Sequence, residues 1–270
     1  MTRYRDLSAL LEANTGSRRL SLVFDDFVEM AALAVRNAVD HQARDQREER
    51  YRRIAQQYSG EQLKRFSQAL ALVTLEMESE PCDVLGRLFM ELDLGNQRLG
   101  QFYTPYDLAR LIAGMTVDRH TITSQIARDG FVTVHEPACG AGAFLIALCD
   151  QVQQAGANPQ TQLHVTAEDV AAEAVHMAYI HLSLLHIPAV VHHRNSLTRE
   201  SVDSWATPAH ILGGWSGRLQ RRSPSDPNTG PTTHVDGTGP RMNDRRPPAH
   251  SSTPPTVIHP DLLVPRKGRR

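Results

Sequence analysis

The spacing of hydrophobic positions changes twice along the chain. Up to about residue 95, apolar side chains recur every three or four positions, which is the period of a helix with one buried face. One such set is Val23, Phe27, Met30, Ala31 and Ala34, and a second is Leu63, Phe66, Leu70 and Val73. Ser59 can cap the second helix, with Gln62 as its reciprocal partner. Residues 1–95 are therefore predicted to form an N-terminal helical domain.

A strongly charged segment, residues 41–53, separates these two sets. Arg and Glu alternate along it, so neither sign accumulates on one side. We interpret it as the solvated face of a helix. A nucleic-acid-binding face is the alternative, which the alternating charges weaken.

From residue 96 to residue 215, short apolar runs alternate with helical patterns. The runs 131–135, 162–167 and 189–192 are predicted to be strands, and residues 142–154 and 171–186 the helices between them. An order of strand, helix, strand, helix, strand predicts parallel strands with right-handed crossovers. We expect an α/β domain over residues 96–219.

The last region, residues 220–270, loses all periodicity. It holds ten of the sixteen prolines, with Ser, Thr, Gly and Asn around them. From Arg218 onward there are ten Arg or Lys residues and four Asp residues, so this end of the chain is basic. Such a composition cannot bury enough apolar surface to offset chain entropy, and it predicts a disordered tail.

Composition narrows the cellular compartment and the partners that we expect for this protein. The formal net charge of −1 neither requires nor excludes a nucleic-acid partner, and the three cysteines form no C-x-x-C pair. An odd number of unpaired cysteines is typical of a reducing cytosol and argues against a zinc site. The N-terminal residues lack the apolar core of a signal peptide, and no apolar run is long enough to span a membrane. We expect a cytoplasmic protein with no membrane partner.

A glycine-rich turn follows the first predicted strand in E-P-A-C-G-A-G-A-F-L, residues 136–145. Gly140 and Gly142 let the backbone approach a ligand closely, and the helix that follows offers free N–H groups. The third small residue of a dinucleotide fingerprint is missing, and the anionic Glu136 would repel a pyrophosphate. S-adenosylmethionine, which carries an ammonium and a sulfonium but no phosphate, suits this acid. A purely structural turn is the alternative.

The same stretch resembles the cofactor motif of the N6-adenine-specific DNA methyltransferases, especially the methylase subunits of type I restriction–modification systems. G-Q-F-Y-T-P, residues 100–105, is similar to the segment that precedes this motif in the family. The resemblance implies a partial Rossmann-like, S-adenosylmethionine-dependent methyltransferase fold. It also implies that Glu136, Pro137, Gly140 and Gly142 hold the cofactor, and that Tyr103, Thr104 and Pro105 close over its methionine end.

A helix is expected directly after this upstream segment. Thr104 is a good N-cap, and Pro105 suits the first helical position. Leu108, Leu111, Ile112 and Met115 share the spacing of an apolar helix face.

Two further residues complete the predicted cofactor site. Asp169 ends the second strand, where an acid accepts hydrogen bonds from ribose hydroxyls, although the register leaves its neighbour Glu168 as an alternative. Asn195 follows the third strand, where the resemblance implies contact with the cofactor's adenine. The alternative for Asn195 is a turn residue.

The family's base-binding motif, N/D-P-P-Y/F, is missing from this sequence. Pro-Pro occurs only at residues 247–248 and 254–255, without the flanking Asn or Asp and without the aromatic residue. Trp205, Pro208 and His210 stand near the expected place. They offer either a substitute base pocket or, as the plainer interpretation, a surface turn with two exposed tryptophans at positions 205 and 215. Catalytic residues therefore stay unknown.

Three histidines recur every five residues at positions 176, 181 and 186. Five residues turn a helix by about 140°, so the three cannot share a metal ion. We expect them to be solvated or singly hydrogen-bonded, and we predict no metal site.

Taken with the resemblance, the sequence predicts a methyltransferase that transfers a methyl group from S-adenosylmethionine to N6 of adenine in DNA. Its partners would be DNA and other restriction–modification subunits. One alternative is a non-catalytic, cofactor-binding partner subunit that lacks the base-binding half. A methyltransferase that acts on RNA or protein is a third option, which explains residues 100–105 less well.

Overall fold

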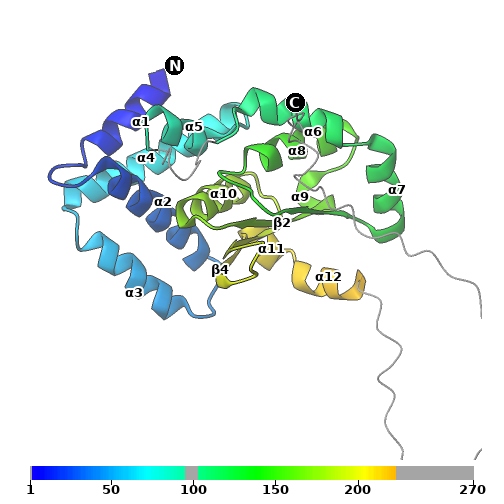
Figure 1. Ribbon diagram of the computed structural model, residues 1–270. Helices are drawn as coiled ribbons and strands as arrows, with labels where there is room; N and C mark the ends of the chain where they lie inside the picture. The colour runs from blue at the N-terminus through cyan, green and yellow to red at the C-terminus, as the bar shows by residue number, and fades with distance from the viewer. Residues whose placement is uncertain (1, 95–102, 223–270) are drawn as a thin grey trace, which may run out of the picture.

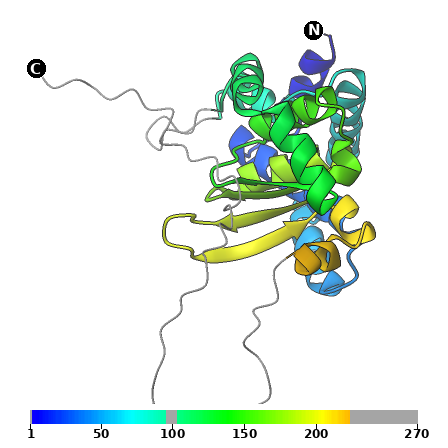
Figure 2. The same ribbon diagram turned by 90° about the vertical axis from the view of Figure 1, so that its right-hand side faces the viewer.

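A four-stranded sheet lies at the centre of the α/β part of the chain. The structure is a computed structural model that describes residues 2–94 and 103–222. In it the strands run in the order β1-β2-β3-β4, with helices over both faces (Figures 1 and 2). The predicted segments 100–102 and 223–270 lie outside the described residues.

Five helices precede the sheet. They are α1 (Thr2–Glu12), α2 (Leu20–Asn37), α3 (Arg44–Ala55), α4 (Gly60–Ser79) and α5 (Val84–Glu91). The two predicted helices are confirmed as α2 and α4, and so is the capping box, because Ser59 Oγ accepts from the Gln62 N–H and Gln62 Oε1 accepts from the Ser59 N–H. Phe27 and Phe66 join the two helices in the core, with ring centroids 5.7 Å apart.

The charged segment forms α3, in which half of the side chains are exposed. Two arginines nevertheless make specific contacts. Arg47 is buried and donates to Asn37 Oδ1 at 2.9 Å, and Arg50 pairs with Glu29 and Asp203. Only one side of this helix is therefore solvated as predicted, because Arg47 and Arg50 on its other side contact residues of α2 and β4.

The α/β part begins with α6 (Tyr106–Thr116) and α7 (Arg119–Asp129). It continues through β1 (Val132–Glu136), α8 (Ala143–Gln154), α9 (Pro159–Gln162), β2 (Leu163–Asp169), α10 (Ala172–Leu184), β3 (Ala189–Arg194), β4 (Ser201–Ala206), α11 (Pro208–Leu212) and α12 (Trp215–Arg222). The first three strands pair in parallel, as predicted. β4 was not predicted. It pairs antiparallel with β3 and leaves β1 at the other edge of the sheet.

The two faces of the sheet differ in chemistry. Val165, Ala167 and Val191 are fully buried and lie toward α8 and α10. On the opposite face, Glu168 is 2% exposed and is paired with His135 Nε2 at 2.8 Å and Arg194 Nε at 2.9 Å. Figure 1 shows α11 and α12 below β2, with α8 and α10 above it.

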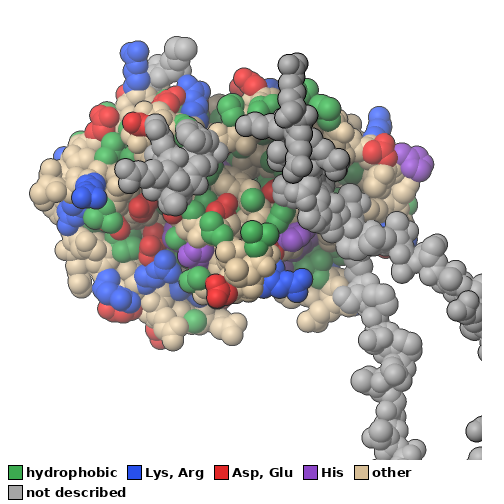
Figure 3. Space-filling view, viewed as in Figure 1, with side chains coloured by type: hydrophobic (Ala, Val, Ile, Leu, Met, Phe, Trp, Pro, Cys, Tyr) green, Lys and Arg blue, Asp and Glu red, His purple; other side chains and the backbone are tan. Residues whose placement is uncertain are grey.

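The helix after the Y-T-P segment differs from its prediction in two respects. α6 begins at Tyr106 with Pro105 as the N-cap, and no side chain caps it, so Thr104 is not the cap. Ala109 and Ala113 pack against the small residues of α8, whereas Leu108, Leu111 and Met115 are 47%, 60% and 80% exposed. Small side chains let the two helices approach closely, so the bulky positions face outward, where hydrophobic side chains reach the surface near α6 (Figure 3).

The prediction of two exposed tryptophans is also wrong. Trp205 and Trp215 are each 1% exposed. Trp205 belongs to β4, and Trp215 begins α12, which covers the start of β1 through an edge-to-face contact with Phe131. Because α12 continues to Arg222, the tail boundary predicted at residue 220 falls inside a helix.

Candidate functional site

The glycine turn lies between β1 and α8. Gly140 has φ +53° and Gly142 has φ +93°, values that residues with a Cβ adopt only under strain. A Cβ on Gly142 would lie 3.4 Å from Ala178 Cα, and one on Gly140 would lie 3.0 Å from the Tyr103 ring. Both glycines are therefore required by backbone geometry, and the turn lies close to α10 on one side and Tyr103 on the other.

Asp169 holds this turn from the end of β2. Its Oδ2 accepts a hydrogen bond from the Gly140 N–H at 2.8 Å, and its Oδ1 accepts one from the Ala171 N–H at 3.0 Å. Glu168, its alternative, points to the opposite face of the sheet, where it meets His135 and Arg194. Asp169 is thus the acid beside the glycine turn. Each oxygen of a carboxylate can accept a second hydrogen bond.

Glu136 ends β1 at the same edge of the sheet. The Ala138 N–H donates to its Oε1 at 3.3 Å. Burial raises the pKa of Glu136, the Ala138 hydrogen bond and His135 lower it, and Asp169 raises it. A half-buried carboxylate with a raised pKa gains most from a cationic neighbour, because the cation favours the ionised form. This property fits a ligand with an ammonium group.

Tyr103 packs directly against the turn. Its ring lies over Gly140 and meets Phe89 of α5 edge to face, with centroids 5.0 Å apart. Thr104 and Pro105 follow it at the exposed surface. The three residues line a cavity of about 680 Å³ that also borders α5. The predicted closing segment therefore lies at the turn, although its first residues, 100–102, are not described.

Asn195 lies in the turn between β3 and β4. Its Oδ1 accepts from the N–H groups of Leu197 at 2.9 Å and Thr198 at 3.2 Å, which is the arrangement of a turn residue. The next residue, Ser196, donates from Oγ to the Pro137 carbonyl at 2.6 Å. This turn therefore lies against the E-P-A-C-G loop, with Ser196 as a contact that sequence reasoning missed.

His181 is a further residue that sequence reasoning missed. It is fully buried, donates from Nδ1 to the Ala141 carbonyl at 2.8 Å and accepts at Nε2 from the Leu85 N–H at 3.2 Å. Burial lowers its pKa, although Asp83 at 3.8 Å opposes this effect. The neutral ring thus connects α5 to the glycine turn.

The expectation that these histidines are solvated or singly hydrogen-bonded is therefore wrong for His181, which makes two hydrogen bonds, and the solvated alternative is also wrong for His176. His176 is also buried and packs edge to face on Trp205, with centroids 4.9 Å apart. His186 is exposed. α10 lies between the sheet and α2, so both of its long sides are covered, which is why two histidines on different sides are buried.

Trp205 and His210 do not form a common base pocket. Trp205 faces α10, against His176 and Tyr179, whereas His210 lies on the opposite face of the sheet against His164. Pro208 begins the short helix α11. Because a sheet separates the two aromatic rings, the substitute pocket is excluded.

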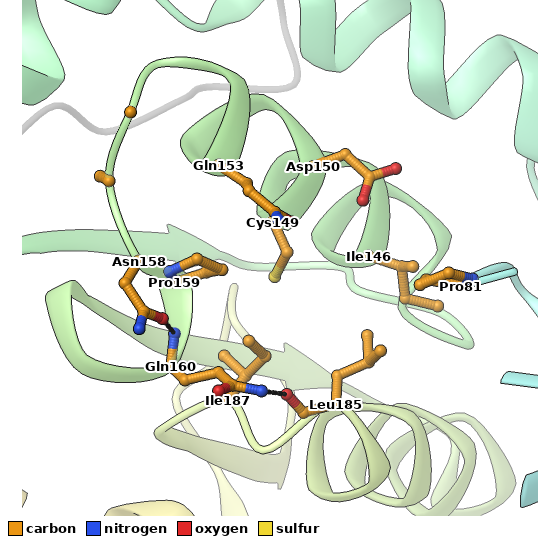
Figure 4. Close-up of a pocket in the computed structure, with 12 residues that line it drawn as sticks. Pro81, Ile146, Cys149, Asp150, Gln153, Asn158, Pro159, Gln160, Leu185 and Ile187 are labelled. Atoms are coloured by element: carbon orange, nitrogen blue, oxygen red, sulfur yellow. Dashed lines mark hydrogen bonds between the residues drawn. The ribbon is translucent and has the colours of Figure 1, made fainter. Parts of the chain in front are cut away.

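A second cavity, of about 590 Å³, lies beside α8 and α9. In Figure 4, Cys149 of α8 faces Ile187, and Gln160 donates to the Leu185 carbonyl at 3.2 Å. Pro159 and Ile187 precede β2 and β3, so this cavity is at the amino ends of the strands. Ligands of parallel α/β sheets bind at the carboxyl ends, where the glycine turn lies.

The described residues offer neither a cluster of metal ligands nor a membrane-spanning helix. No group of three or more His, Cys, Asp or Glu side chains there is placed to hold a metal ion. None of the helices within residues 2–94 and 103–222 has both the length and the apolar character needed to cross a membrane.

Comparison with known proteins adds a match to one family model over part of the chain. Residues 91–212 match the N-6 DNA methylase family, a range that includes Tyr103, the glycine turn and Asp169. The resemblance seen in the sequence is confirmed over this range. The match implies S-adenosylmethionine as the cofactor.

A search of curated proteins found no match. One similar solved structure is a putative class I S-adenosylmethionine-dependent methyltransferase from Listeria monocytogenes, with a TM-score of 0.37 and 15% identity. The likeness covers 75% of this chain and 56% of that one, so the chain spans little more than half of that protein.

Proposed function

We propose that this protein contributes to the methylation of N6 of adenine in DNA, with residues 96–219 as its cofactor-binding part. The observation that carries the proposal is the N-6 DNA methylase match, which spans the glycine turn and both acids beside it. When bound, S-adenosylmethionine would supply the activated methyl group. The rest of the proposal concerns what the chain's own residues do for it.

The residues around the turn have distinct proposed roles. Gly140 and Gly142 let the backbone approach the cofactor, and the first N–H groups of α8 face it. Asp169 accepts hydrogen bonds from the ribose while it keeps the turn in place through Gly140. Glu136 pairs with the ammonium group. Tyr103, Thr104 and Pro105 cover the methionine end, and Pro137 shapes the turn.

Asn195 has a narrower proposed role. Its carbonyl oxygen is already used by the β3–β4 turn, so only its amide NH₂ group is left to reach an adenine ring. Its neighbour Ser196 keeps that turn beside Pro137. We therefore assign adenine proximity to the turn as a whole.

A second function is favoured by a specific observation. Among the described residues, Trp205 and His210 are buried on opposite faces of the sheet, and the sequence holds no N/D-P-P-Y/F motif. A cofactor-binding subunit that relies on another polypeptide for the adenine pocket accounts for both facts. In that case DNA and other restriction–modification subunits would be the partners.

Titration calorimetry with S-adenosylmethionine tests the cofactor site. The wild-type chain should bind, and Gly140→Trp should abolish binding because a side chain there meets Tyr103. Gly156→Trp is the matched control, since Gly156 also has positive φ but has open space around it. Absence of binding in the wild type, or equal effects of both variants, would refute the site.

Transfer of labelled methyl groups to DNA separates the two functions. A chain that methylates adenine alone is the enzyme of the first proposal. A chain that binds the cofactor but methylates only when a partner subunit is added fits the second. Cofactor binding without methylation of adenine under either condition would rule out both.

A further inference from the structure

A row of three hydrogen-bonded side chains lies on the sheet face opposite α8 and α10. His164 Nε2 is 2.9 Å from His210 Nδ1, and His210 Nε2 is 3.0 Å from Ser216 Oγ. His164 belongs to β2, His210 to α11 and Ser216 to the first turn of α12. His164 precedes Asp169 by five residues, about 16 Å along a strand, so the row is separate from the cofactor site.

We propose that Ser216 is the nucleophile of a second catalytic site, in which His210 is the base and His164 orients it, and that this site accepts the acyl group of an activated carboxylic ester. The inference is independent of the methyltransferase proposal, since it uses different residues at the other end of the strands.

The order of atoms is the one that nucleophilic catalysis requires. A base must contact the nucleophile through one ring nitrogen and an orienting group through the other. His210 does so, with Nε2 toward Ser216 and Nδ1 toward His164. In the tautomer that we assign, His210 donates its Nδ1–H to His164 Nε2. The lone pair of His210 Nε2 then accepts the hydroxyl proton of Ser216.

The two histidines are rigidly held. His164 is 2% exposed and His210 is 7% exposed. Thr207 caps α11 by accepting the His210 N–H at Oγ1, and the His164 ring lies against Trp215, with centroids 5.4 Å apart. Burial lowers the pKa of both rings, so both are neutral at pH 7 and each carries one unprotonated ring nitrogen.

The nucleophile itself is open to solvent. Ser216 is exposed, whereas its two partners are not. Two glycines form the tight turn that places Ser216 beside α11. Gly214 has φ +61°, and a Cβ on Gly213 would lie 2.6 Å from the Ala209 carbonyl oxygen. Ser216 is therefore the member of the row that is exposed at the protein surface.

Backbone donors adjoin the nucleophile. The Arg218 N–H reaches the Gly214 carbonyl at 3.3 Å, so the N–H groups of Ser216 and Gly217 precede this bond in the first turn of α12. Donors at and just after a nucleophile are placed to stabilise an oxyanion.

The proposed reaction transfers an acyl group to Ser216 and then to water. Ser216 Oγ attacks the carbonyl carbon and forms a C–O bond, while its proton passes to His210 Nε2 and the carbonyl electron pair moves to oxygen. Collapse breaks the bond to the leaving alcohol, which takes the proton from His210. Water then attacks the acyl-serine by the same route and releases the carboxylic acid.

A fluorophosphonate probe tests the nucleophile on the full chain. The wild type should gain one covalent adduct, located by mass spectrometry on Ser216. Ser216→Ala should abolish labelling, and thermal denaturation should show that this variant still unfolds in one cooperative transition. Ser204→Ala is the matched control: Ser204 Oγ also contacts a histidine, His192 Nδ1 at 2.7 Å, but should not affect labelling.

The histidines have separate readouts. His210→Gln should slow labelling about 100-fold, the effect of removing a general base. His164 is a positioning residue, so His164→Gln, which keeps an acceptor, should label faster than His164→Leu. No adduct in the wild type, an adduct that persists in Ser216→Ala, or equal rates in the two His164 variants would overturn the proposal.

Discussion

Asp169 Oδ2 accepts the backbone N–H of Gly140 at 2.8 Å, which ties the end of β2 to the glycine turn that follows β1. The bond joins residues 29 positions apart in the sequence. It is charge-assisted, and such bonds contribute more to stability than neutral ones. The shape of the turn therefore depends on an acid that also belongs to the proposed cofactor site.

Replacing this acid should weaken cofactor binding. Asp169→Ala removes the side chain that accepts the Gly140 N–H, so this N–H group loses its acceptor. A hydrogen bond to a charged group contributes about 1.5–3 kcal/mol, which predicts roughly a 10- to 100-fold rise in the Kd for S-adenosylmethionine. Asp169→Asn keeps one acceptor oxygen and should lose less. Asp203→Asn, in β4, is the control, and an unchanged Kd in Asp169→Ala would contradict the assignment.

Two glycines with similar backbone angles offer a paired test. Gly142 has φ +93° and Gly156 has φ +90°, but only Gly142 has another segment, α10, within 4 Å of the added Cβ. Alanine at either position should lower the free energy of unfolding by about 1–2 kcal/mol, the cost of a left-handed conformation. Only Gly142→Ala should also raise the Kd for S-adenosylmethionine. Denaturant titration and calorimetry measure the two effects.

The buried ring of His181 should be important for stability. His181→Leu leaves the Leu85 N–H and the Ala141 carbonyl without their partner. Unsatisfied buried groups cost about 1–3 kcal/mol each, so we expect a loss of about 3 kcal/mol in the free energy of unfolding. His186→Asn is the control, because His186 is exposed and its φ of +56° suits Asn. Equal losses in both variants would contradict this role.

Acid should destabilise the protein through buried histidines. Burial, with a smaller contribution from Arg50, lowers the pKa of His176 to about 3. Between pH 6.5 and 3 the unfolded chain binds a proton at this ring and the folded chain does not. The free energy of unfolding therefore falls as the pH falls through this range, and the contribution of His176 is fully present above pH 6.5. The slope from this group is about 1.4 kcal/mol per pH unit.

His176→Phe tests this slope and keeps an aromatic ring against Trp205. Denaturant titrations at pH 6, 5 and 4 should show a shallower loss of stability in the variant. His41→Gln, at an exposed position, should leave the slope of the wild type unchanged. A His176→Phe slope equal to that of the wild type would mean that His176 is protonated in the folded chain.

Periodicity predicted the parts of the fold in which each element has a continuous apolar pattern. The strands β1 to β3, the helices between them and the capping box of Ser59 were all found in this way. β4 was missed because three of the six residues of S-V-D-S-W-A are polar, and only Trp205 among its side chains is buried. A strand at the sheet edge needs one buried anchor, which gives no repeating pattern.

The errors at the site have a different cause. His181 meets Leu85 and Ala141, which are 96 and 40 residues away, and no local pattern encodes such distant contacts. The face of α6 was misassigned because Leu108 and Leu111 outweigh the alanines in any hydrophobicity scale. Packing selected Ala109 and Ala113 instead, since close contact with α8 depends on small side chains.

The placement of His181 couples the local opening of α5 to that of the glycine turn. One imidazole ring accepts the Leu85 N–H and donates to Ala141, so local opening of either segment breaks a bond that both need. The Leu85 amide should then exchange with deuterated solvent at a rate set by the turn as well as by its own helix. A ligand bound at Gly140 and Gly142 would slow that exchange from the far side of the ring.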